Sequence, residues 1–142
     1  MKVLLPIDGS PCSQRAVEHV IASRARWADA GAMEIHLVNV QPTVSGDVSQ
    51  FVSSTQLAAY HAEESAKALA QARTLLDAAG VKYSVHARTG HAAVEIAALA
   101  DEIQCDQIVM GTQGRGALAE LLVGGTTLRV VHLTKVPVLL IK

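Results

Sequence analysis

Aromatic residues are scarce in this chain, where Phe, Trp and Tyr make up 3% of the sequence while hydrophobic residues as a whole make up 50%. The core must therefore be built from Val, Leu, Ile and Ala, a mixture that suits parallel strands covered by alanine-rich helices. Charge is also low and balanced, with 12 Lys and Arg against 13 Asp and Glu and a formal net charge of −1. Such a chain has no overall field that would attract nucleic acid or an anionic membrane, and we expect neither partner.

Cysteine is limited to Cys12 and Cys105, which form no CxxC pair and no metal-ligand spacing. We expect both to be free thiols of a cytoplasmic protein. No apolar run approaches the ~20 residues of a membrane-spanning helix, and the first residues show no signal-peptide layout. The six histidines include no pair four residues apart and no HExxH motif, so no metal site is predicted.

Apolar runs and helical patterns alternate along all 142 residues. The patterns predict a loop at 41–51 and two sets of regular elements, namely strands at 3–7, 33–40, 81–88, 106–111 and 136–141, and helices at 11–30, 52–79, 91–103 and 124–133. This alternation predicts an α/β fold: a single domain with an open parallel five-stranded sheet and helices on both faces. Ligands of such sheets bind at the carboxyl ends of the strands, where Asp8, Val38–Asn39 and Gly111 are expected to converge.

A glycine-rich segment follows the apolar run at 108–110: Gly111 and Gly114 come first, and Gly124 and Gly125 stand before the last predicted helix. Glycine has no Cβ, so backbone N–H groups can turn toward an anion. A helix N-terminus adds unpaired donors and the positive end of the helix dipole. This arrangement predicts a phosphate site, and hence a bound nucleotide.

On these residues the chain resembles the universal stress proteins of the UspA type. The resemblance covers essentially the whole length, with its clearest matches at 3–10, 106–111 and 136–141. The glycines at 111, 114 and 124 have the spacing of the family's nucleotide motif, G-x2-G-x9-G-[ST], but Gly125 stands where Ser or Thr is expected. The resemblance implies a Rossmann-like, adenine nucleotide alpha hydrolase-like fold with strand order 3-2-1-4-5.

The same resemblance implies an ATP site, with or without Mg²⁺. Asp8 would accept a hydrogen bond from the adenine or ribose end, and Val38 would pair with adenine through its backbone. The glycines at 111 and 114 would follow the ribose and the first phosphates. Residues at the start of the last helix would hold the remaining phosphates. The full set of predicted nucleotide-binding residues is Pro6, Asp8, Val38, Met110, Gly111, Gly114, Arg115, Gly124, Gly125 and Thr126.

Several of these residues also have a purely structural interpretation. Asp8 can serve only to cap the turn before the first helix, and Val38 can be simply a core residue of an apolar strand. Gly111 can be an ordinary turn glycine, and Arg115 a solvated surface residue. The missing hydroxyl at Gly125 removes one hydrogen bond to a phosphate, so we expect weakened rather than abolished ATP binding.

Catalytic machinery is not evident in the sequence, and we predict that the protein is not an enzyme. The glycine segment lacks a Walker lysine, and no GxSxG motif is present. The turn at 8–13, Asp-Gly-Ser-Pro-Cys-Ser, does not fit the SGGxDS loop of ATP pyrophosphatases. Three functions stay open: an ATP-binding stress-response or regulatory module, a nucleotide-free homodimeric adaptor of the UspA branch, and slow ATP hydrolysis.

The last predicted strand, at 136–141, is strongly apolar and is placed at a sheet edge by the family's strand order. Pro137 is compatible with an edge because proline cannot donate to a neighbouring strand. An unprotected apolar edge would aggregate, whereas pairing with its own copy around a two-fold axis would cover it. We therefore predict a homodimer through this strand.

Overall fold

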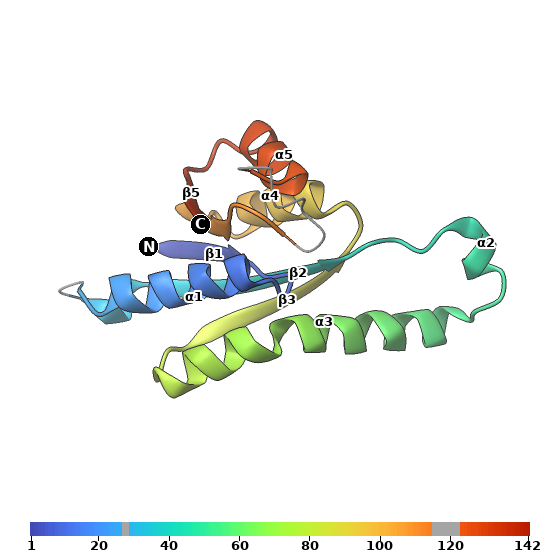
Figure 1. Ribbon diagram of the computed structural model, residues 1–142, viewed down its shortest axis with the longest axis horizontal. Helices are drawn as coiled ribbons and strands as arrows, with labels where there is room; N and C mark the ends of the chain where they lie inside the picture. Colours follow the sequence, from blue (N-terminus) through green and yellow to red (C-terminus); the bar gives the residue numbers. More distant parts are fainter. Residues whose placement is uncertain (27–28, 115–122) are drawn as a thin grey trace.

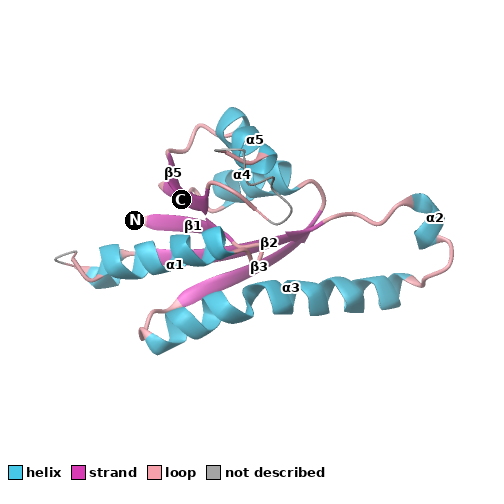
Figure 2. Ribbon diagram, viewed as in Figure 1, coloured by secondary structure: helices cyan, strands magenta, loops and turns pink. Residues whose placement is uncertain are grey.

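The computed structural model describes residues 1–26, 29–114 and 123–142. The described strands, drawn in magenta in Figure 2, form one sheet in which every neighbouring pair is parallel, in the order β3-β2-β1-β4-β5. Its strands are β1 (Lys2–Pro6), β2 (Glu34–Gln41), β3 (Tyr83–Thr89), β4 (Gln107–Gly111) and β5 (Val138–Ile141). The predicted fold class and strand order are confirmed, and β3 and β5 form the two edges.

Helices cover both faces of the sheet (Figure 1). The helices α1 (Pro11–Arg24) and α3 (Ser54–Ala78) pack on one face, and α4 (Ala92–Glu102) and α5 (Gly125–Leu133) pack on the other. Because successive strand residues point to opposite faces, Leu5 of β1 joins the core under α1 and α3, whereas Leu4 joins the core under α4 and α5. Both leucines are fully buried, so the aliphatic composition fills two separate cores.

The helix predicted at 11–30 is shorter than expected. It begins as predicted, with Ser10 accepting a hydrogen bond from Ser13 N at 3.2 Å and Pro11 as the first helical residue. It ends at Arg24, and a separate 3₁₀ turn, η1, spans Ala30–Ala32. The Asp29 carboxylate accepts a hydrogen bond from Gly31 N at 3.1 Å. This local side-chain bond favours a turn over continued α-helix.

The segment at 41–51, predicted as a loop, contains the short helix α2 (Gly46–Ser49). The long helix α3 follows, and a capping box fixes its start: Ser53 Oγ accepts from Gln56 N, and Gln56 Oε1 accepts from Ser53 N. Its boundaries lie within two residues of the predicted 52–79. The first half of α3, with α2, extends beyond the carboxyl ends of the strands (Figure 1).

The third strand departs from the alternation that predicted it. It starts at Tyr83, because Val81 belongs to the preceding turn, where Val81 N donates to Leu76 O at 3.0 Å. Val85 was predicted on the apolar face, yet 40% of it is exposed. The strand lies at the sheet edge, where the covering helix no longer shields every inward position.

Candidate functional site

A cavity of about 490 Å³ opens at the carboxyl ends of β1, β2 and β4, beside the starts of α1, α4 and α5. A volume of this size is typical of small-molecule and cofactor sites. Seven of the ten predicted binding residues line it: Pro6, Asp8, Val38, Met110, Gly111, Gly114 and Thr126. Gly124 and Gly125 stand next to it at the start of α5, and Arg115 lies outside the described residues.

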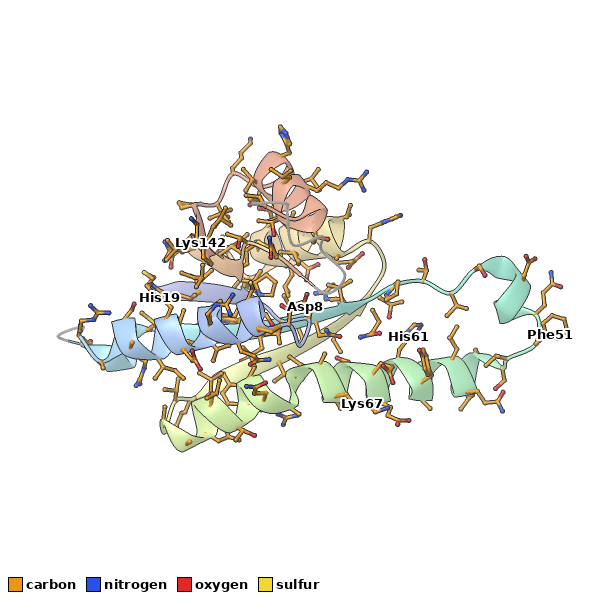
Figure 3. The ribbon with its side chains drawn as sticks, viewed as in Figure 1. Asp8, His19, Phe51, His61, Lys67 and Lys142 are labelled. Atoms are coloured by element: carbon orange, nitrogen blue, oxygen red, sulfur yellow. The ribbon has the colours of Figure 1, made fainter. Side chains whose placement is uncertain are left out.

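Asp8 follows β1 and stands beside the start of α1 (Figure 3). Its Oδ1 accepts a hydrogen bond from Ser10 N at 2.9 Å, so the residue does cap the turn. Its Oδ2 faces the glycine segment, since a Cβ built on Gly114 would lie 2.6 Å from that oxygen. Asp8 therefore combines the structural role with a carboxylate oxygen at the cavity, and it is the one charged residue among the described residues that line it.

Gly111 ends β4 where the first turn of α1 passes very close. A Cβ built on Gly111 would lie 2.6 Å from Cys12 Cβ and 2.8 Å from the backbone carbon of Cys12. The Gly111 carbonyl accepts a hydrogen bond from Thr127 Oγ1 of α5 at 3.1 Å. Gly111 thus lets α1, β4 and α5 meet at one edge of the cavity.

The start of α5 is held against the end of β4 by a short backbone bond, from Gly124 N to Thr112 O at 2.7 Å. Gly124 is the N-cap residue and supplies no side-chain cap. In the described structure the N–H groups of the first turn can therefore face an anion, with the positive end of the helix dipole behind them. A Cβ at Gly125 would meet nothing within 4 Å in the described structure, so a larger residue fits there.

The backbone of β2 runs past the end of β1, and this feature was missed in the sequence. The paired register ends at Pro6 and Val38, while β2 continues beside β3 as far as Gln41. The backbone of Val38 was predicted to pair with adenine, and its carbonyl accepts a hydrogen bond from Ile7 N at 2.8 Å. That group therefore serves the sheet.

Val40, two residues further on, lies where β1 has already ended. Backbone groups of alternate strand residues point to the same side, so the N–H and C=O of Val40 point past the end of β1, into the cavity that Val40 lines. If the ladder continued, Val40 N–H would donate to Ile7 O. Instead Asn39 Nδ2 donates to Ile7 O at 2.8 Å, and Gln41 Nε2 donates to Asn39 Oδ1 at 2.9 Å.

Other expectations concern metal ions and thiols. Among the described residues there is no cluster of three His, Cys, Asp or Glu side chains that could hold a metal ion. Cys12 and Cys105 are both free, as predicted, and both are buried. Burial raises the pKa of the Cys105 thiol, so this group stays protonated at neutral pH. None of the described helices has the length and hydropathy that spanning a membrane requires.

Comparison with known proteins decides the family. The family model described as the universal stress protein family matches residues 1–142. The chain belongs to this family. One relative, universal stress protein MJ0531 of Methanocaldococcus jannaschii, is 34% identical over 143 residues, which cover 99% of this chain and 81% of the relative.

Solved structures share the fold of this universal stress protein. Hypothetical protein MJ0577 superimposes with a TM-score of 0.82 at 28% identity, covering 99% of this chain and 94% of the other. A universal stress protein in complex with cAMP gives a TM-score of 0.71 at 24% identity, covering 100% of this chain and 97% of the other. Two further family members hold dAMP and AMP, at 18% identity and TM-scores of 0.70 and 0.66.

Proposed function

We propose that this universal stress protein binds an adenine nucleotide in the cavity at the carboxyl ends of β1, β2 and β4, and acts as a stress-response or regulatory module rather than as an enzyme. The observation that carries the proposal is the convergence of three unlike groups on one cavity: the backbone edge at Val40, the Asp8 carboxylate and the start of α5. Together they suit a base, a sugar and a phosphate. The adenine nucleotides held by structural neighbours support this assignment.

Each part of the nucleotide has a proposed partner. The N–H and C=O of Val40 would pair with the adenine edge, which moves the expected backbone contact two residues along from Val38. Asp8 would accept from a ribose hydroxyl, and Gly114 gives that carboxylate room. The first turn of α5, through Gly125 and Thr126, would bind phosphate with its backbone N–H groups.

We propose ATP as one physiological ligand. Mg²⁺ would enter with the phosphates and neutralise part of their charge. Because the Asp8 carboxylate is anionic, it is the described residue that fits a nucleotide-bound cation best. We further propose that residues 1–142 form one universal stress protein domain, supported by the family match over that range, and that the protein works in the cytoplasm, supported by its two free thiols.

The test is to purify the protein without added nucleotide, denature it, and identify any released compound by chromatography and mass spectrometry. The stripped protein is then titrated with AMP and with ATP, in the presence and absence of Mg²⁺. Released adenine nucleotide, or a micromolar dissociation constant, is the expected result. No release and no binding up to millimolar nucleotide would reject the proposal and favour the nucleotide-free adaptor.

Replacing Gly125 by serine is expected to tighten nucleotide binding. No described atom lies within 4 Å of the added Cβ, and the hydroxyl on it would donate to a phosphate oxygen. A hydrogen bond to a charged group contributes about 1.5–3 kcal/mol, which corresponds to an affinity gain of roughly 10- to 150-fold. Isothermal titration of the natural protein and Gly125→Ser measures the gain in nucleotide affinity. Gly125→Ala is the matched control, because it adds the Cβ without the hydroxyl. Equal affinities for all three proteins would show that Gly125 is not part of the nucleotide site.

We also propose that the protein forms a homodimer through β5. The bonds from Ile108 N to Pro137 O and from Thr112 N to Ile141 O show that odd-numbered residues of β5 face β4. The backbone groups of Val138 and Leu140 therefore point to the open sheet edge, where a second copy of the strand can pair with them.

Light scattering at micromolar concentration is expected to give the dimer mass for the natural protein. Leu140→Pro should shift it to the monomer mass, because proline removes an edge-facing N–H while sparing the odd-numbered residues that bond to β4. Leu140→Ala keeps that N–H and controls for the lost side chain, so it should stay dimeric. A monomer mass for the natural protein would refute pairing through β5.

A further inference from the structure

A second cavity, of about 530 Å³, lies on the α3 side of the molecule. The segment that leaves β2, the first half of α3 and the end of β3 enclose it. Of the residues that line it, only Gln41 also lines the nucleotide cavity. The two cavities are therefore neighbours that share one lining residue, and the second also has the volume of a small-molecule site.

One face of α3 forms the longest wall of this second cavity. Its lining residues recur every three or four positions, as residues on one side of a helix do: Ser54, Leu57, Ala58, His61, Ala62 and Ser65. This half of α3 reaches beyond the sheet (Figure 1), and Figure 3 shows His61 on the side that faces the segment leaving β2. The cavity fills the space between that segment and the helix.

Two polar atoms at this wall lack hydrogen-bond partners among the described residues. Ser65 is 3% exposed, and its Oγ has no partner. His61 Nδ1, one helical turn earlier on the same face, is buried and also without a partner. Buried polar atoms are nearly always hydrogen-bonded in native proteins. Two unpaired polar atoms on the same helix face, at the wall of a cavity, are available to a ligand group that bonds to both.

The described lining carries little charge. Although Arg88 belongs to it, the Arg88 guanidinium donates to the Glu102 carboxylate of α4, with Nη1 at 3.3 Å from Oε1. Side chains alternate along a strand, so Arg88 points to the α4 face, whereas Ala87 and Thr89 point to the cavity. Apolar surface from Leu57, Val44 and Ala87 makes up much of the remaining wall.

We propose that this cavity binds a small uncharged organic molecule, with an apolar body and one hydroxyl or carbonyl group. The body would pack between Leu57 and Ala87, and the polar group would bond to Ser65 Oγ and His61 Nδ1. The site is separate from the nucleotide cavity, so both ligands bind at the same time. The proposal stands on its own residues and does not depend on the proposed nucleotide function.

The experiment uses 1-naphthol as the probe, because it is neutral, apolar and fluorescent and carries one hydroxyl. The full-length protein is titrated by fluorescence, and the contact residues are located by amide shifts in nuclear magnetic resonance spectra. Saturable binding of the probe is expected, with the amide shifts concentrated at residues 54–65. Both the probe affinity and these shifts should be the same when AMP is saturating. Ser65→Ala should weaken binding at least fivefold while leaving the fold intact, since it removes an unpaired buried hydroxyl.

A matched pair of variants tests the location. Ala62→Leu places a larger side chain at the cavity, and Ala59→Leu makes the same change at a position of α3 outside the lining. The first should reduce probe affinity at least tenfold, and the second should leave it unchanged. Three results would overturn the proposal: displacement of the probe by AMP, equal probe affinities for the two variants, or no saturation in the natural protein. The third result would mean that the cavity holds water only. Nucleotide titration of the same samples tests the proposed function independently.

Discussion

Replacing Gly111 by alanine is expected to destabilise the folded protein by at least about 3 kcal/mol, the upper range for overpacking a well-packed interior. The new methyl group would lie 2.6 Å from Cys12 Cβ and 2.8 Å from the backbone carbon of Cys12. A side-chain rotation cannot relieve a contact with backbone. The start of α1 would have to move away from β4, although α1 is anchored by Ala16 and Val17, both fully buried.

Urea denaturation of the variant and the natural protein measures this loss from the shift of the midpoint. Gly46→Ala is the control, because a Cβ there meets nothing within 4 Å and the residue lies in a helix. It should change the free energy of unfolding by less than about 1 kcal/mol. A Gly111→Ala variant as stable as this control would show that α1 does not depend on the close approach to β4.

Replacing Gly114 by alanine is expected to affect nucleotide binding strongly and the stability of the fold only slightly, unlike Gly111→Ala, which mainly destabilises the fold. Its Cβ would lie 2.6 Å from Asp8 Oδ2, and the next nearest atom, Asp8 Cγ, would be 3.8 Å away. The obstacle is therefore the end of one side chain, which can rotate aside. We expect less than about 1 kcal/mol of lost stability, but at least a tenfold loss of adenine nucleotide affinity, equivalent to about 1.4 kcal/mol, because the carboxylate leaves its place at the cavity.

A double-mutant cycle with Asp8→Ala separates this mechanism from others. If Gly114→Ala acts by displacing the carboxylate, it should cost almost nothing further once Asp8 is already alanine. Titration calorimetry on the natural protein, the two single variants and the double variant gives the coupling free energy between the two substitutions. If the affinity losses of the two substitutions are additive, Gly114 contacts the nucleotide itself. If Gly114→Ala alone leaves nucleotide affinity unchanged, neither Gly114 nor Asp8 takes part in the proposed ribose contact.

Gly111 and Gly114 show what could be predicted from the sequence alone. Their spacing predicted a phosphate loop after a buried strand, and the cavity has formed where the carboxyl ends of β1, β2 and β4 meet. The spacing could not separate their roles, because what a Cβ would meet depends on α1 and Asp8, which are distant in sequence. The alternation of strands and helices along the chain likewise predicted a parallel sheet. The strand order came from family resemblance, because several strand orders fit the same alternation.

The misses have a common physical origin in side chains that bond locally or across strands. The chain forms a turn at Asp29 within the range predicted as helix, although the apolar spacing of that range gave no sign of it. The open backbone edge at Val40 was missed because it depends on where β1 ends relative to β2, and on Asn39 donating to the Ile7 carbonyl. The second cavity depends on how far α3 extends past the sheet, a length that periodicity predicted without showing what lies opposite.

The three residues of β2 that continue beyond β1 bear on how this family can diverge. A backbone N–H and C=O are the same in every residue type except proline. Substitutions at Val40 would therefore leave the proposed base contact in place, while an insertion or deletion in β1 or β2 would shift the register and turn those groups away. Purifying selection at this point would act on segment length rather than on residue identity, and relatives with little sequence in common could retain the same ligand.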